Sequence, residues 1–268
     1  MKMTRTFPLI VAVAIGLTAC EDGLGSNSLL SDDELTNDVA ASSGDAIATS
    51  IDVLIANQTL SGLPQSSVQS GVAAANTSNL TFSRTRTCFS ASDSEIPCNN
   101  LANVRKIVTH VTVDGSRSGD HTTRDGGTAT WSGTVQRVLD DTLVRVFNTE
   151  QPPAETSRIH SGVGTGTDNT EFTSGDLSRE ATETFTDSVK AITFNLPRSS
   201  NPWPVSGSTK RVVAVHVTVT RGSDTQTRDV TRTVEVIFPA DAQGNVTLHI
   251  NDKTCQLNLV THAVTNCQ

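Results

Sequence analysis

Aromatic and apolar residues are scarce in this sequence. Its 268 residues include no tyrosine, two tryptophans and eight phenylalanines, and hydrophobic residues make up only 35% of the chain. This composition argues against a thick globular core. It favours long polar strands that each bury one thin apolar face. The length allows one large β domain or two small ones.

Positive charge is also in deficit. The chain has 20 lysine and arginine residues against 28 aspartate and glutamate residues, which gives a formal net charge of −8 at pH 7. Nucleic-acid binding depends on lysine and arginine side chains that neutralise phosphates. We therefore expect no nucleic-acid partner.

The sequence also lacks the motifs that identify common enzymes and cofactor sites. It contains no G-x-S-x-G, no H-E-x-x-H and no EF-hand loop. The glycine-rich segment Ser161–Gly166 has no helix after it to receive a phosphate, so we interpret it as a strand or loop. Six histidines lack metal-ligand spacing and are interpreted as solvent-facing or cross-strand residues: His110, His121, His160, His216, His249 and His262. We expect no catalytic residue, no metal site and no cofactor.

One apolar run stands out, from Phe7 to Ala19, and it follows the basic residues Lys2 and Arg5. A positive start, a short apolar centre and a small residue at the end are the parts of a secretory signal. The run is shorter than the roughly 20 residues that a membrane-spanning helix needs. An ordinary cleaved signal is the remaining alternative.

The run ends in Leu17-Thr18-Ala19-Cys20, which resembles the lipobox of bacterial lipoproteins. The resemblance implies cleavage before Cys20, a diacylglyceryl group on its sulfur and a fatty acid such as palmitate on its amine. Glu21 follows the cysteine, and by the same resemblance this favours the outer membrane over the inner one. Residues 1–19 are then a signal peptide, and the membrane is a partner through the lipid.

Four cysteines follow Cys20, and an exported chain with four cysteines favours two disulfides. Three pairings are possible. We predict the local one, Cys88 with Cys98 and Cys255 with Cys267, because each pair brackets a short loop or hairpin. A metal site is the competing interpretation, but no C-x-x-C or H-x₃-H spacing supports it.

The chain divides into three further regions. Residues 20–33 are polar and glycine-rich and are predicted to be a flexible tether. Residues 34–79 are predicted to hold one broken or two short helices, weakened at Ser42-Ser43-Gly44, and then a linker. From residue 80 to 268 the apolar period is two, most clearly in Arg211–Thr220, which predicts strands.

The predicted fold class is mainly β. We expect an antiparallel meander of about 9–10 strands, as a sandwich or open barrel, with a short helical segment near the N-terminus. His110-Val-Thr-Val113 recurs as His216-Val-Thr-Val219, which suggests duplicated halves at 80–150 and 180–268. The charged segment Arg179–Lys190 is most simply a solvated strand at a sheet edge.

Two function classes remain open. The first is a lipid-anchored binding or interaction module of the cell envelope, whose ligand is a protein, a glycan or a hydrophobic molecule. A curved sheet with a helix across its concave side is a fold that lipoprotein carriers use, which is an analogy at the level of fold alone. The second is a hydrolase-like envelope enzyme with a site built from loops.

Overall fold

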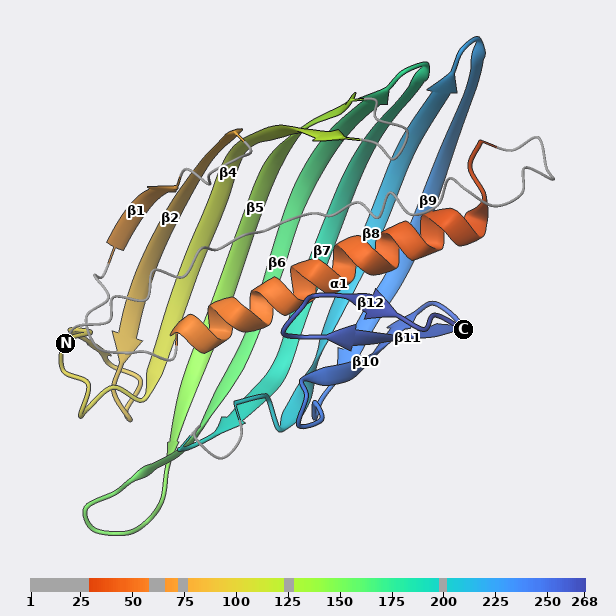
Figure 1. Ribbon diagram of the computed structural model, residues 1–268. Helices are drawn as coiled ribbons and strands as arrows, with labels where there is room; N and C mark the ends of the chain where they lie inside the picture. Colours follow the sequence, from red (N-terminus) through yellow and green to blue (C-terminus); the bar gives the residue numbers. More distant parts are fainter. Residues whose placement is uncertain (1–28, 58–65, 72–76, 123–127, 198–201) are drawn as a thin grey trace, which may run out of the picture.

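The computed structural model describes residues 29–57, 66–71, 77–122, 128–197 and 202–268. They form a single antiparallel sheet with one long helix, α1, across one face (Figure 1). The predicted signal peptide and the lipobox cysteine Cys20 lie outside the described residues and stay predictions. Within the described ranges, no helix has the length and apolar character that crossing a membrane requires.

The strands follow one another along the sheet as they do along the chain. The order is β1-β2-β4-β5-β6-β7-β8-β9-β10-β11-β12, and β3 pairs with β2. The predicted fold class, a mainly β antiparallel meander with a helix near the N-terminus, is confirmed as one open sheet. Its strands are β1 Ser66–Gly71, β2 Thr77–Phe89, β3 Glu95–Ile96, β4 Lys106–Thr122, β5 Thr128–Phe147, β6 Glu155–Ser174, β7 Leu177–Asn195, β8 Ser206–Arg221, β9 Asp224–Ile237, β10 Asn245–Ile250, β11 Lys253–Asn258 and β12 Val264–Thr265.

The helix α1, Asp32–Asn57, is one uninterrupted element and not two short ones. Ser31 caps it, because its Oγ accepts a hydrogen bond from the backbone N–H of Glu34 at 3.1 Å. Gly44, which was expected to weaken the middle, instead permits close packing. A Cβ at this position would overlap the side chain of Val264 on β12.

Two expectations about local structure need correction. The segment 60–79, expected to be a linker, contains β1 and the start of β2. β1, with the sequence SSVQSG, is an edge strand, and among the described strands it pairs with β2 alone. The repeated His-Val-Thr-Val segments lie in the hairpins β4–β5 and β8–β9. Gly115 is inside β4, whereas Gly222 forms the β8–β9 turn, so the hairpins differ in length. Duplication stays a prediction.

Both predicted disulfides are present. Cys88 bonds to Cys98 with a Cα–Cα distance of 5.2 Å, and Cys255 bonds to Cys267 with a Cα–Cα distance of 4.1 Å. The first joins β2 to the loop that follows β3. The second joins the chain after β12 to β11. Each disulfide therefore crosslinks a short segment at one end of the sheet to a neighbouring strand.

Candidate functional site

The face of the sheet that α1 covers, called here the inner face, has an apolar half. α1 packs mainly against β8–β12. The helix contributes a stripe of apolar side chains at helical spacing, and β8 contributes an apolar side chain at every second position. All of these side chains are buried. These side chains are Leu35, Val39, Ile47, Ile51 and Leu54 from α1, and Val213, Val215, Val217 and Val219 from β8. This half is the hydrophobic core, and its side chains are used for packing.

The other half of the inner face, formed by β2, β4 and β5, combines apolar and cationic side chains. Four of its apolar side chains, Phe82, Val111, Val113 and Leu139, are half-buried, unlike the valines of β8. Others on the same half are buried, namely Ile107, Val135 and Leu143. Apart from Arg145 near the end of β5, the strand registers place four arginines on the same face: Arg84, Arg86, Arg117 and Arg137. We call this half the arginine face. Four guanidinium groups on one part of a chain with net charge −8 mark it as electrostatically distinct.

β6 crosses the inner face with glycines at every second position. Gly162, Gly164 and Gly166 all lie on this side, as their partners on β5 and β7 show. A Cβ at Gly166 would overlap the ring of Phe185 on β7. The glycine-rich segment interpreted as strand or loop is therefore a strand, and its missing side chains let neighbouring groups lie close to the sheet.

An ionic cluster surrounds Phe185 at the boundary between the two halves. Arg211 on β8 donates to Asp187 at 3.0 Å, and its Cζ lies 3.6 Å from the centroid of the Phe185 ring. Arg137 on β5 donates to Asp168 on β6, through Nε at 3.2 Å and also through a terminal nitrogen. The ring thus has a paired guanidinium group on each side, and cation–π attraction adds to both ion pairs.

The carboxylates of β7 take part in this cluster, which corrects the expectation of a solvated edge strand. β7 lies between β6 and β8, and its alternate residues Glu183 and Asp187 face inward. Burial raises the pKa of Glu183, and the nearby Asp168 raises it further. Burial also raises the pKa of Asp187 despite its bond to Arg211. The charged sequence of β7 could not show that these carboxylates are buried, because their ionic partners lie on other strands.

The arginines of the arginine face repel one another. Arg84 and Arg86 lie two residues apart on the same face of β2, and Arg86 is only 7% exposed. Burial lowers the pKa of Arg86 to about 10, with a further decrease from the charge of Arg84, while Asp141 opposes the decrease. Burial and the charge of Arg137 likewise lower the pKa of Arg117, while Asp168 and Asp45 oppose the decrease. Positive charge is therefore concentrated where it is costly to keep.

A buried aspartate–histidine pair lies beside this face. Nδ1 of His160 on β6 is 3.0 Å from Oδ2 of Asp141 on β5, and their side chains are 0% and 4% exposed. Among the described contacts, His160 Nε2 and Asp141 Oδ1 have no hydrogen-bond partner. Sequence reasoning missed this pair, because the two residues are 19 positions apart and only the pairing of β5 with β6 brings them together.

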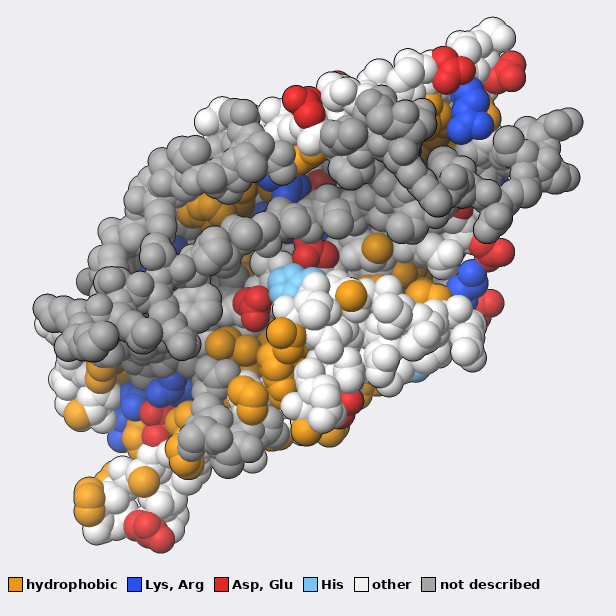
Figure 2. Space-filling view, viewed as in Figure 1, with side chains coloured by type: hydrophobic (Ala, Val, Ile, Leu, Met, Phe, Trp, Pro, Cys, Tyr) orange, Lys and Arg blue, Asp and Glu red, His pale blue; other side chains and the backbone are white. Residues whose placement is uncertain are grey.

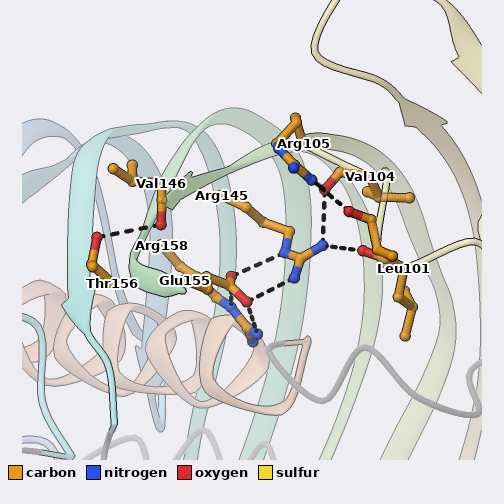
Figure 3. A network of polar contacts seen from close by, with 9 residues as sticks. Leu101, Val104, Arg105, Arg145, Val146, Glu155, Thr156 and Arg158 are labelled. Carbon is orange, nitrogen blue, oxygen red and sulfur yellow. Dashed lines mark hydrogen bonds and ion pairs between the residues drawn. The ribbon is translucent and has the colours of Figure 1, made fainter. Parts of the chain in front are cut away.

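A second ionic cluster closes the inner face at the ends of β5 and β6 (Figure 3). The guanidinium of Arg145 donates to both carboxylate oxygens of Glu155, at 3.0 and 2.8 Å. Its remaining nitrogen donates to the backbone oxygens of Leu101 and Val104 at 2.6 and 2.8 Å. Arg158 holds Glu155 from the other side, at 2.6 and 3.0 Å. The cluster ties the loop before β4 to β5 and β6.

Acid should weaken this second cluster. Burial by itself would raise the pKa of Glu155, but hydrogen bonds from Arg158 and Arg145 lower it from 4.5 to about 2. A lowered pKa gives stability that is complete above the unfolded value and is lost as the pH falls toward 2. We expect the loss of unfolding free energy in Glu155→Gln to be largest near pH 6 and to shrink between pH 4.5 and 2 in denaturant titrations. A difference that stays constant with pH would contradict this origin.

Ion pairs fix the position of α1 on the sheet. Asp38 accepts from Arg179 of β7 at 2.6 Å, and Asp32 accepts from Arg232 of β9 at 2.7 Å. His262, after β11, lies between two helix carboxylates, with Nδ1 2.9 Å from Asp45 and Nε2 3.2 Å from Asp52. The helix is therefore held across the inner face by charged contacts as well as by its apolar stripe. Figure 2 shows charged side chains lying among apolar ones on the side of the molecule that carries α1.

The outer face is polar and hydroxyl-rich. His110 pairs with Asp140 and His216 with Asp229, each at 2.7 Å across neighbouring strands. Their histidine side chains are 47% and 57% exposed, so the predicted solvent-facing position of these two histidines is confirmed. His216 and Asp229 also line an open depression between β7, β8 and β9. In the described part of the chain, no group of three or more histidine, cysteine, aspartate or glutamate residues could hold a metal ion.

Comparison with known proteins adds no function. No protein-family model, no curated protein and no solved structure matches this chain. The predicted disulfide cysteines lie apart, near two ends of the sheet. Cys88 is on the inner side of β2, two residues beyond Arg86, and packs with Ile107 and Leu143, whereas Cys255 belongs to the core under α1. The best-supported site is therefore the arginine face itself, which combines half-buried apolar groups with concentrated positive charge.

Proposed function

We propose that the protein is a lipid-anchored lipoprotein of the bacterial cell envelope, held at the outer membrane by acylated Cys20. Its β domain is proposed to be a binding module that takes an apolar or amphiphilic molecule on the arginine face. The observation that carries this proposal is the contrast in burial within one face. α1 seals the valines of β8, whereas Phe82, Val111, Val113 and Leu139 stay half-buried.

The contrast favours binding because half-buried apolar groups keep a driving force for association. Each square ångström of apolar surface removed from water contributes about 25 cal/mol, so a molecule that covers these four side chains gains affinity. The charged rim is typical of a site that orients a ligand, since ligand sites combine an apolar wall with a few placed polar groups.

The hydrolase alternative has weaker support. Asp141 and His160 have the geometry of a base and the group that orients it. However, no described serine, threonine or cysteine donates a hydrogen bond to His160, and the dyad lies in a fully buried position. An envelope enzyme stays a prediction without a nucleophile assigned to it.

A neutral fluorescent probe tests the proposed binding. Full-length chain carrying Cys20→Ala should enhance the fluorescence of N-phenyl-1-naphthylamine saturably. Val113→Asn should weaken this binding about tenfold, because it places an amide against the apolar ligand. Thr112→Asn is the matched control, since Thr112 is the next residue of β4 and points to the outer face. Equal binding by both variants, or no saturable binding by the parent, would contradict the proposal.

A further inference from the structure

Part of β9 has a neighbouring strand on one side only. β10 pairs with β9 at Val234–Ile237, and Asn251 binds both the backbone N–H and the backbone C=O of Thr233. Between the hairpin turn at Gly222-Ser223 and Thr233, the described structure places no strand beside β9 on the side away from β8 (Figure 1). The sheet therefore ends at this stretch of β9, residues 224–232, which we call the open edge.

The backbone groups along the open edge can be identified from the hydrogen bonds of β9. Because Thr233 turns its N–H and C=O away from β8, every second residue before it does the same. These residues are Thr225, Thr227, Asp229 and Thr231, and their side chains are exposed. The N–H groups of all four and the C=O groups of the first three have no hydrogen-bond partner among the described residues. Such a row is a template for another strand.

The open edge lacks common features that prevent strands from pairing at an edge. Natural edge strands are blunted by lysine, by proline or by a bulge. Residues 224–232 contain no lysine and no proline, and β9 pairs with β8 without a register shift. The inward charge of Arg228 is already engaged, because its guanidinium donates to the backbone oxygen of Leu30 at 3.0 Å. The edge is therefore competent to pair.

The length of the open edge restricts how a second copy can pair with it. Two copies of β9 would run antiparallel about a two-fold axis, as in a symmetric dimer. With the axis at Thr227, Gly222 in the turn of one copy lies opposite Arg232 of the other, the last residue of the open edge. An axis further from the turn would drive that turn into Asn251. An axis closer to the turn pairs fewer residues, so Thr227 gives the longest ladder.

The side chains agree with this register. It opposes Thr227 with its own copy, and Thr225 with Asp229, on the outer face. On the inner face it opposes Gln226 with Arg228, so like charges do not face each other. Cross-strand hydroxyl pairs already join β8 and β9, with oxygen–oxygen distances of 3.1 Å. The strand is thus its own complement in charge, in hydroxyl groups and in backbone donors and acceptors.

We propose that the open edge of β9 pairs with the open edge of a second copy of this chain. Two sheets then join into one continuous antiparallel sheet, with the two-fold axis at Thr227. This contact lies at the β9 side of the sheet, apart from the arginine face of β2, β4 and β5. It is an interaction surface in addition to the proposed binding site, and it does not depend on the ligand of that site.

Cysteine crosslinking of the full-length Cys20→Ala chain tests the contact and its register. The four remaining cysteines are held in disulfides, so a cysteine introduced into β9 supplies the free thiol. Thr227→Cys should give a covalent dimer on oxidation with copper phenanthroline, because opposed Cα atoms lie about 5.5 Å apart, within the range of disulfides. Thr231→Cys is the matched control on the same strand and face. Its own copy would lie more than about 20 Å away, so it should not crosslink.

Sedimentation velocity gives the second measurement. The Cys20→Ala parent should form a concentration-dependent dimer. Thr227→Pro should raise the dissociation constant at least about tenfold, because it removes the central N–H of both copies and leaves the hydrogen bonds to β8 intact. A parent that stays monomeric at the highest concentration reached would overturn the proposal.

Two further outcomes would also overturn it: equal crosslinking of the two cysteine variants, and a dimer that Thr227→Pro leaves unchanged. If circular dichroism shows the proline variant to be unfolded, the cysteine variants decide. Selective crosslinking of Thr227→Cys then supports the contact, and its absence overturns the contact.

Discussion

Replacing Arg145 with methionine should lower the free energy of unfolding by about 3–5 kcal/mol, the range typical of removing one partner from a buried ion pair. The substitution keeps the length of the side chain and removes every donor. Glu155 would lose two of its hydrogen bonds, and the backbone oxygens of Leu101 and Val104 would lose theirs. Buried acceptors left without donors carry the full cost of desolvation.

Urea denaturation at pH 7 measures this effect. The matched control is Lys210→Met, which removes a cation from the exposed outer face of β8 and should change stability by less than about 0.5 kcal/mol. Equal, small effects of both variants would show that Arg145 does not stabilise the contact between β5, β6 and the loop before β4.

Replacing Cys20 with alanine should abolish membrane attachment. A lipoprotein anchor carries several acyl chains, and each buried methylene contributes about 0.8 kcal/mol, so two or more chains make attachment effectively stable. Without the thiol no chain is added. We expect the variant to move from the membrane fraction to the soluble fraction and to lose all label from radioactive palmitate.

The control for this experiment is the double variant Cys255→Ala with Cys267→Ala, which breaks a disulfide and keeps Cys20. It should retain the palmitate label and the membrane fraction. Label that persists in the Cys20→Ala protein would refute the anchor, and with it the assigned place in the envelope.

The two ionic clusters and the helix contacts suggest how the fold tolerates so few apolar residues. Arg137–Asp168 and Arg211–Asp187 occupy inward positions that a larger core would fill with aliphatic groups. Such pairs offset much of their own desolvation but add little net stability. Their geometry does define how strands meet around Phe185, and it leaves charge beside the proposed binding surface.

Local chemistry made several features predictable from the sequence. The alternation of valine with polar residues in β8 marks one buried face, because side chains in a strand point to opposite sides in turn. Close spacing of the cysteine pairs predicted both disulfides, and the structure confirms them. The helical spacing of apolar residues from Leu35 to Leu54 predicted a helix here. Gly44 led us to expect a break in it, whereas α1 is uninterrupted.

The identity of the inner face could not be predicted in the same way. In β2 and β6 both faces carry polar residues, so alternation says which residues share a face but not which face is covered. Arg179 meets Asp38 across 141 positions, and His160 meets Asp141 only because β5 and β6 pair in one register. The arginine face likewise exists only once β2, β4 and β5 are aligned.

The amino-acid order alone determined the strand period, the local crosslinks, the acidic balance and the predicted acylation signal, because each depends on neighbours within a few residues. The tertiary structure decided where charge is buried, where the helix lies and which half of the sheet keeps apolar groups half-buried. These features depend on contacts between distant segments. Such contacts form only after the strand register has brought the side chains together and removed them from water.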